Sequence, residues 1–341
     1  MKALKTTAER HVDVVELPIP HAETGGVVIQ MKATGICGSD LHPYRRPTKW
    51  HLAEGSFISG HEPSGEIVEV GQGVTGWKVG DRVAPYFRRT CGECANCRAA
   101  MRHVCTNRRA SYGHQGCDGS HTEYMRVEEP CLIRLPDHLS YLDGAILACQ
   151  GGTAYAPLAR MDVSGRDVLV VTGLGPVGLL SIVFAKAMGA TIVGIDPSAG
   201  RRALAEQLGA VLTIDPTEGN VNEQLRATFP DGADKLTETS GAASAYAVMG
   251  DLLRARGTIA IVGGGTPELT MPRGGFGARE LTIFGSSAYP PYMFAEIAEF
   301  VRRHDLKLDS VVSRSFPLDD GAEAFRVAAD ANTGKVVFTF D

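Results

Sequence analysis

The chain has 341 residues and a formal net charge of −5, from 34 Lys and Arg against 39 Asp and Glu. Hydrophobic residues make up 44% and charged residues 21%, which is typical of a globular protein large enough for two domains. The acidic excess argues against a nucleic-acid-binding protein, because such proteins usually carry a basic excess.

The first 20 residues contain no apolar segment of the kind found in a secretory signal, so we expect a cytoplasmic protein. Its eight cysteines should then be reduced, which favours metal binding or catalysis over disulfide bonds. One apolar stretch, from Val168 to Ala185, has the length of a membrane span, but Pro176 and three glycines interrupt it. A strand, a turn and a helix explain this stretch better than one membrane helix.

Short β-rich runs cut by glycine and proline fill roughly the first 145 residues. The expected strands lie within residues 25–36, 65–71, 80–87 and 123–136. From about residue 151, strands alternate with helical runs, which predicts an α/β domain with a parallel sheet covered on both faces. Its strands are expected at 167–173, 191–196, 211–215, 235–241 and 257–265, with helices at 176–190 and 199–210. The last segment reads as strand, helix and strand without a core of its own, so it should pack onto the first domain.

A glycine pattern follows the first strand of the second domain. Gly173, Gly175 and Gly178 form G-x-G-x-x-G between a strand and a helix, where the backbone can approach a pyrophosphate at the helix N-terminus. Asp196 ends the next strand, and a carboxylate there hydrogen-bonds a ribose hydroxyl and repels a 2′-phosphate. NAD is therefore favoured over NADP. We expect Arg201 and Arg202 to form the exposed face of the following helix; the alternative is that they meet a 2′-phosphate.

Four cysteines, Cys91, Cys94, Cys97 and Cys105, lie within 15 residues. Four thiolates in a compact lobe can close a tetrahedral shell around zinc and leave no position for a substrate, so this pattern predicts a structural zinc. An iron–sulfur cluster also uses four cysteines and is the alternative. His103 lies inside the lobe, but we do not expect it to be a ligand, since the thiols suffice.

A second group of metal-binding residue types is more ambiguous. "CGSDLH" begins at Cys37, and "SGHEPSG" supplies His61 and Glu62. Taken alone, Cys37 could be a buried thiol and His61 an ordinary buried histidine.

The order of the motifs decides between these readings. "GICGSDLH", "GHEPSGEIVEVGQGVTGWKVGDRV", the cysteine spacing and "GLGPVG" together resemble the zinc-dependent medium-chain alcohol dehydrogenases, including branches that act on secondary alcohols, polyols and threonine. The resemblance covers essentially the whole chain. It implies a β-rich GroES-like catalytic domain at 1–150 with a structural zinc lobe at about 91–105. A Rossmann NAD-binding domain would follow at 151–283, and residues 284–341 would return to the catalytic domain.

The resemblance also implies roles for individual residues. Cys37, His61 and Cys149 would hold a catalytic zinc and leave one position open, and Glu62 would lie close to the metal and replace water during exchange. Asp40 would orient His61. Ser39 and His42 would relay the proton. The cofactor-binding residues would be Gly173, Gly175, Pro176, Val177, Gly178, Asp196, Arg201, Thr153, Val262 and Gly263.

The activity implied is oxidation of an alcohol to a ketone or aldehyde, and the reverse, by hydride transfer from a zinc-bound alkoxide to NAD. Two zinc ions per chain and a homotetramer or homodimer are implied as well. Cys149 weakens a sorbitol-type assignment, since that branch often carries Glu there. The rivals are a zinc-free quinone-reductase-like enzyme and an NAD-binding structural protein, and the intact set of Cys37, His61 and Cys149 argues against both.

The substrate is the least specified feature. Trp50 and Phe87 offer apolar walls, while Arg46 and Arg88 belong to two arginine pairs in the same region. Arginines bind carboxylates or several hydroxyls, so a secondary alcohol, polyol or sugar-derived alcohol is expected, with an acidic or amino alcohol such as threonine as the alternative. The arginines could equally be exposed loop charges. Lys235 and Thr237 depart from the apolar strand residues usual in the family.

Overall fold

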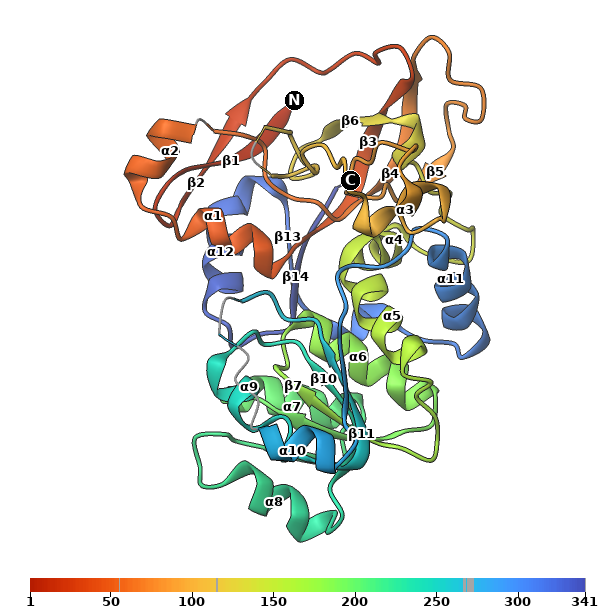
Figure 1. Cartoon of the computed structure of the whole chain (residues 1–341). Helices are drawn as coiled ribbons and strands as arrows, with labels where there is room; N and C mark the ends of the chain where they lie inside the picture. The colour runs from red at the N-terminus through yellow and green to blue at the C-terminus, as the bar shows by residue number, and fades with distance from the viewer. Residues whose placement is uncertain (55, 115, 266–267, 269–272, 341) are drawn as a thin grey trace. The chain divides into compact units, whose positions relative to one another are not determined.

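The computed structural model describes residues 1–54, 56–114, 116–265, 268 and 273–340, and the chain divides into two compact units (Figure 1). The first unit comprises Met1–Gly152, Pro290–Asp330 and Lys335–Asp341. The second comprises Thr153–Tyr289 and Ala331–Gly334. The short stretch Ala331–Gly334 thus belongs to the second unit, although it lies within the segment 284–341 that we expected to return to the first.

A six-stranded sheet forms the centre of the first unit, in the order β13-β14-β3-β4-β5 with β6 also paired to β3. Its strands are β3 (Gly26–Ile36), β4 (Pro63–Val70), β5 (Arg82–Val83), β6 (Tyr124–Glu128), β13 (Val312–Phe316) and β14 (Lys335–Thr339). Every pair is antiparallel except β13 with β14. Val336 of β14 lies opposite Ile36 of β3, so the C-terminal strand pairs beside the end of the strand that leads to Cys37.

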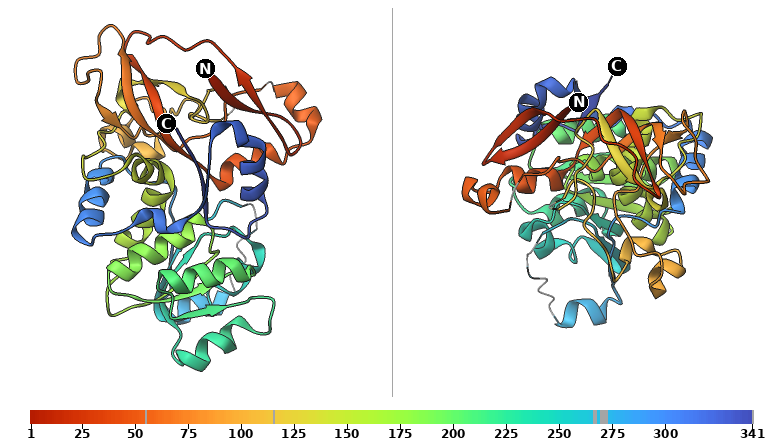
Figure 2. Two further views of the ribbon diagram at one scale, coloured as in Figure 1. Left: turned by 180° about the vertical axis from the view of Figure 1, so that it is seen from behind. Right: turned by 90° about the horizontal axis from the view of Figure 1, so that it is seen from above.

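Two expected strands are shorter than the sequence indicated. The run at 80–87 contributes only Arg82–Val83, since Pro85 lacks the backbone N–H that a longer ladder needs. The run at 123–136 is a strand only to Glu128, after which Pro130 lies in a 3-10 turn, Glu129–Cys131. The N-terminal hairpin of β1 (Lys2–Ala8) and β2 (His11–Glu16) was not anticipated and can be followed in Figure 2.

The helices of the first unit are short. They are α1 (Leu41–Tyr44), α2 (Thr48–Glu54), α3 (Ala95–Arg98), α4 (Tyr141–Ile146), α11 (Met293–Arg303) and α12 (Gly321–Ala329). A π-helical segment, Leu147–Gly151, connects α4 to α5 (Gly152–Arg160). Such wide turns inside helices frequently occur at functional sites.

The second unit contains a parallel six-stranded sheet in the order β12-β11-β10-β7-β8-β9. Its strands are β7 (Val168–Thr172), β8 (Thr191–Ile195), β9 (Leu212–Ile214), β10 (Ala233–Glu238), β11 (Leu253–Ile261) and β12 (Thr282–Gly285). Its further helices are α6 (Pro176–Ala187), α7 (Ala199–Leu208), α8 (Val221–Thr228), α9 (Ala243–Val248) and α10 (Arg273–Ala278). The predicted α/β domain with a parallel sheet is confirmed.

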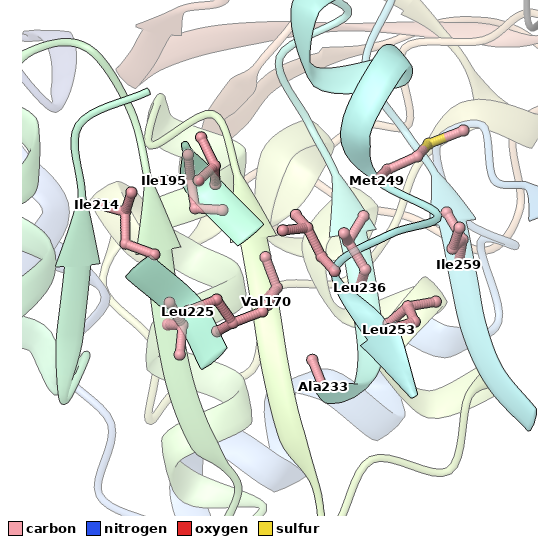
Figure 3. Packing of buried hydrophobic residues seen from close by; sticks show 12 residues of the cluster. Val170, Ile195, Ile214, Leu225, Ala233, Leu236, Met249, Leu253 and Ile259 are labelled. Carbon is pink, nitrogen blue, oxygen red and sulfur yellow. The ribbon is translucent and has the colours of Figure 1, made fainter. Parts of the chain in front are cut away.

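Apolar residues of neighbouring strands build the core on one face of this sheet. Val170, Ile195 and Leu236 are buried beside one another, and Leu225 of α8 packs on the same cluster (Figure 3). Central parallel strands are covered on both faces, which is why β7 and β8 read as continuous apolar runs. The stretch from Val168 to Ala185 is accordingly β7, a turn and most of α6. No helix within the described ranges is long and apolar enough to cross a membrane.

Candidate active site

The segment that follows β3 folds into a 3-10 turn, Gly38–Asp40, and then α1. The carboxylate of Asp40 closes this turn, because its Oδ2 accepts a hydrogen bond from the backbone N–H of Cys37 at 2.8 Å. Its Oδ1 lies 3.0 Å from Nδ1 of His61, and both side chains are buried. One carboxylate therefore fixes the turn and orients the imidazole.

One ring nitrogen of His61, Nδ1, is used in the hydrogen bond to Asp40. Because Asp40 accepts from Nδ1, Nε2 is the atom left for a metal ion. The hydroxyl of Ser39 lies 3.3 Å from this Nε2. Burial alone would lower the pKa of His61, but the charges of Asp40 and Cys37 raise it well above the ordinary value. The surroundings of the ring therefore favour a positive charge at this point.

Cys149 comes from the π-helical segment Leu147–Gly151 and is buried. A hydrogen bond between the two thiols lowers the pKa of Cys37, with the charge of His61 adding to the effect, although burial opposes it. The same hydrogen bond and burial raise the pKa of Cys149. The first proton thus leaves Cys37, which gives the thiolate that a metal ion requires.

Four side chains from three distant parts of the sequence converge here. One ligand atom from each of Cys37, His61, Glu62 and Cys149 lies within 4.8 Å of the others. The Oε1 atom of Glu62 is buried and has no hydrogen-bond partner among the described residues. Two sulfurs, one imidazole nitrogen and a carboxylate oxygen form a donor set that zinc accepts. The residues present fit a catalytic zinc.

Lys335 belongs to the same cluster and was missed by sequence reasoning. Its buried Nζ donates to Oε2 of Glu62 and to the backbone oxygen of Ile36 at 2.9 Å. Burial raises the pKa of Glu62 to about 7, although Lys335 opposes this. Gly35 leaves room for the pair, since a Cβ there would lie 2.0 Å from Oε2. The only signal in the sequence was a charged residue at the start of the apolar run "KVVFTF".

The cysteine lobe forms a second compact group, around α3. The ligand atoms of Cys91, Cys94, Cys97 and Cys105 all lie within 4.8 Å of one another. Hydrogen bonds from the backbone of Cys97 and of Thr106 lower the pKa of Cys94 to about 5. Four thiols at this spacing fit a closed tetrahedral zinc shell, which is a structural site. His103 is not part of this group.

The glycine loop between β7 and α6 has the geometry that its sequence predicts. Gly173 has φ +82°, and a Cβ there would lie 2.7 Å from Ser240. A Cβ at Gly178 would lie 2.0 Å from the oxygen of Gly173, so the loop closes tightly at both glycines. Gly175 precedes α6, and Pro176 and Val177 lie in its first turn. The N-terminus of α6 therefore follows the glycine loop directly, and a helix N-terminus is suited to bind phosphate.

Asp196 lies just beyond β8 and beside the glycine loop. Its Oδ2 accepts from the backbone N–H of Leu174 at 2.7 Å, and its Oδ1 accepts from that of Ser198 at 2.8 Å. Val262 and Gly263 follow β11, and their backbone N–H groups both donate to the oxygen of Glu238 at 2.8 Å. Loop, carboxylate and the end of β11 therefore belong to one end of the parallel sheet. Thr153, the remaining cofactor candidate, begins the second unit.

The expectation that Arg201 and Arg202 are an exposed helix face is wrong. Arg201 donates to the backbone oxygen of Thr333 at 3.2 Å and lies 3.8 Å from Asp196, while Arg202 pairs with Asp215 at 2.8 Å. Their side chains are only 19% and 18% exposed. The segment Ala331–Gly334 covers Arg201, and nothing in the sequence placed this segment beside α7.

The expected substrate residues have different surroundings. The ring of Phe87 lies 5.2 Å from that of His61, which places it at the metal set. Arg88 packs over Phe87 and donates to the backbone oxygen of His103. The ring of Trp50 lies 5.0 Å from that of His51 and 6.0 Å from the guanidinium of Arg46, and neither of these residues belongs to the metal set.

The other members of the arginine pairs, and the relay histidine, lie elsewhere. Arg45 donates to the backbone oxygen of Ala329 at 3.2 Å, and Arg89 pairs with Glu128 at 2.6 Å. His42 lies on α1 with its side chain exposed.

Two family models match the chain, the alcohol dehydrogenase GroES-like domain over residues 23–137 and the zinc-binding dehydrogenase over residues 176–303. The zinc-type alcohol dehydrogenase-like protein YphC of Escherichia coli is 36% identical over 96% of each chain. L-Threonine 3-dehydrogenase of Shewanella baltica is 31% identical over the full length of both. The solved structure of galactitol-1-phosphate dehydrogenase from Escherichia coli matches with a TM-score of 0.89 at 25% identity, covering both chains completely.

These matches extend over both units and agree with the two donor sets and the glycine loop. The expectation drawn from the motifs is confirmed: the chain belongs to the zinc-binding alcohol dehydrogenase family and is an oxidoreductase that acts on CH–OH groups.

Proposed function

We propose that this protein oxidises a secondary alcohol of the polyol or sugar-derived class with NAD as hydride acceptor, and catalyses the reverse reduction. The observation that carries the proposal is the convergence of half-buried Cys37 with buried His61, Glu62 and Cys149, with Asp40 orienting His61. Cys37, His61 and Cys149 would hold the catalytic zinc and leave one position open, with Glu62 close to the metal. Cys91, Cys94, Cys97 and Cys105 would hold the structural one.

Each residue of the site has a physical task. Zinc held by the set would act as a Lewis acid that lowers the pKa of an alcohol and polarises a carbonyl. Ser39, whose hydroxyl lies beside Nε2 of His61, would take the proton of the alcohol and pass it toward exposed His42 and solvent. Phe87, whose ring lies 5.2 Å from that of His61, would help to keep water from the imidazole.

The carboxylate of Asp196 supports NAD over NADP. It is fixed by backbone N–H groups on both sides, so it keeps its position beside the glycine loop. A 2′-phosphate brought to this carboxylate would be repelled, whereas ribose hydroxyls can donate to it. Arg201 donates to the backbone oxygen of Thr333 and lies 3.8 Å from Asp196, so its guanidinium already has partners within the protein and is less available to a 2′-phosphate.

A neutral substrate fits the arginine pairs better than an acidic one. Arg45, Arg88 and Arg89 each have a partner inside the protein, whereas Arg46, which is exposed like Arg45, lies over the ring of Trp50. Galactitol-1-phosphate dehydrogenase and L-threonine 3-dehydrogenase, two of the relatives, are named for charged substrates, so the case for a neutral substrate rests on the partners of the arginines and not on family membership. Homodimer or homotetramer formation and a cytoplasmic location stay predictions.

The test is a panel of neutral polyols, simple secondary alcohols and threonine, with NADH formation followed by absorbance in wild-type protein and in Ser39→Ala. We expect the polyols to have the highest kcat/KM with NAD, and NADP to be a poor acceptor. Ser39→Ala should lower turnover while zinc content and NAD affinity stay the same. Preference for threonine, or unchanged turnover in Ser39→Ala, would contradict the proposal.

The arginines can be tested in the same assay. Arg46→Ala and Arg88→Ala should change kcat/KM to a similar extent for neutral and acidic alcohols, because neither arginine is proposed to bind a carboxylate. A selective loss on acidic alcohols would instead favour the acidic-substrate reading.

A further inference from the structure

A histidine that no motif singled out lies beside the catalytic metal set. The ring centroid of His114 is 5.2 Å from that of His61, the same distance at which Phe87 contacts it. His114 is half-buried and comes from a loop that joins the cysteine lobe to β6. His61 thus has an apolar ring and a polar ring as neighbours.

The loop is tied closely to the residues that precede His61. A Cβ at Gly113 or at Gly119 would lie 2.0 Å from the backbone oxygen of Gly60, so both glycines are required for this close approach. Ser120 donates its N–H to the same oxygen at 2.9 Å, and Tyr112 donates its N–H to the oxygen of Phe87 at 3.0 Å. The position of His114 relative to the metal set is therefore built into the backbone.

The hydrogen bonding of His114 leaves one ring nitrogen available. Its Nδ1 lies 3.0 Å from the backbone oxygen of Tyr112, which can only accept, so Nδ1 is the donor. Among the described residues no group hydrogen-bonds Nε2, and this atom is not sealed from solvent. A polar atom with no internal partner, at a fixed place beside the metal ligands, is suited to bind a ligand.

We infer that Nε2 of His114 hydrogen-bonds a second hydroxyl of the substrate, on a carbon next to the reacting one, and thereby selects diols and polyols over monoalcohols. The inference rests on the proposed function, since it places the reacting hydroxyl at the metal set. A hydroxyl can either donate to or accept from an imidazole nitrogen. Phe87, the other ring beside His61, would pack against the carbon chain.

Specificity of this kind has a clear physical basis. A bound monoalcohol would cover Nε2 against solvent without offering it a hydroxyl, and a polar group left unpaired in this way costs more than its hydrogen bond contributes. His114 is therefore a specificity-determining residue and takes no part in the proton relay of Ser39.

The test compares butane-2,3-diol with butan-2-ol, which have the same carbon chain, in wild-type protein and in His114→Phe, His114→Gln and His21→Phe. His114→Phe keeps the ring and removes the polar atom, and His114→Gln restores a polar group of similar reach. His21 is an exposed histidine outside the site, with a side chain 89% exposed, and serves as control.

We expect His114→Phe to lower kcat/KM for the diol by about tenfold to a hundredfold, as for a substrate hydroxyl left without its partner, and for the monoalcohol by less than about threefold. His114→Gln should recover part of the loss, and zinc content and NADH binding should be unchanged in all variants. Equal losses on both alcohols, or no loss on the diol, would overturn the inference and leave the proposed function standing. A wild-type protein that oxidises neither alcohol nor any polyol would overturn both.

Discussion

Asp40 shows how much of the site depends on one carboxylate. It closes the turn after β3 through the N–H of Cys37 and holds Nδ1 of His61, so two metal ligands depend on it. Both partners come from motifs that the sequence displays, "CGSDLH" and "GHE", and the family pattern predicted this pairing.

Asp40→Asn should weaken zinc binding at the catalytic site by about tenfold to a hundredfold, because a carboxylate behind a metal-binding histidine fixes the ring and raises its basicity. The measurement is competition for zinc with a chelator of known affinity. Asp13→Asn, at an exposed pair with His11, is the control. Equal zinc affinity in Asp40→Asn and wild type would show that His61 does not depend on this carboxylate.

The contacts of Lys335 with Glu62 and of His114 with His61 could not be predicted from the sequence. Lys335 is 273 positions from Glu62, and His114 is 53 positions from His61, so neither contact follows from local spacing. Both depend on β14 pairing with β3 and on the close approach of Gly113 to Gly60, which only the tertiary structure contains.

At the scale of elements, strand β14 places a charged side chain in an apolar interior. Lys335 begins this strand and meets Glu62, with both side chains fully buried. A buried pair is costly to break from one side, because the remaining charge is left unpaired.

Lys335→Met should therefore destabilise the protein by about 3–5 kcal/mol, and Lys335→Met combined with Glu62→Gln should restore part of this stability. Thermal and urea unfolding of the full chain would measure both effects. A Lys335→Met variant as stable as wild type would mean that the pair is not closed in solution.

Strand β10 has a second departure from an apolar pattern, and the structure explains it. Lys235 pairs with Asp167 at 2.8 Å and donates to the backbone oxygen of Asp162 at 2.5 Å, which anchors the strand to the loop before β7. Burial would raise the pKa of Asp167, but Lys235 and Ser164 lower it below its ordinary value. Thr237 on the same strand has no hydrogen-bond partner for its hydroxyl among the described residues, and nothing in the structure explains that choice.

Lys235→Met should cost about 1–3 kcal/mol at pH 7, because Asp167 loses its charged partner. A carboxyl with a lowered pKa stabilises the fold above its unfolded pKa of about 3.9 and loses that contribution as the pH falls through its folded pKa. The difference between wild type and variant should thus be constant from pH 8 to pH 5 and shrink below about pH 4. Unfolding by urea at several pH values measures this; a difference that grows at acidic pH would contradict the pairing.

At the scale of the whole molecule, the order of motifs predicted more than any single motif. Alternating strands and helices after residue 151 gave the parallel sheet, and the G-x-G-x-x-G loop lies where β7 meets α6. The β-rich part was less predictable, because short strands such as β5 and the hairpin of β1 and β2 depend on pairing partners far away in the sequence. The join of Ala331–Gly334 to the second unit could not be predicted at all, since it depends on contacts with Ser198 and Arg201.

The central claim is that two separate donor sets hold two zinc ions and that the set around Cys37 performs the chemistry. Zinc per chain, measured by metal analysis on wild type, Cys37→Ser and the matched variant Cys94→Ser, tests it most directly. We predict two zinc ions in wild type and one in each variant, with alcohol oxidation absent from Cys37→Ser even though its structural zinc is retained. Two zinc ions in Cys37→Ser, or undiminished alcohol oxidation by that variant, would contradict the account.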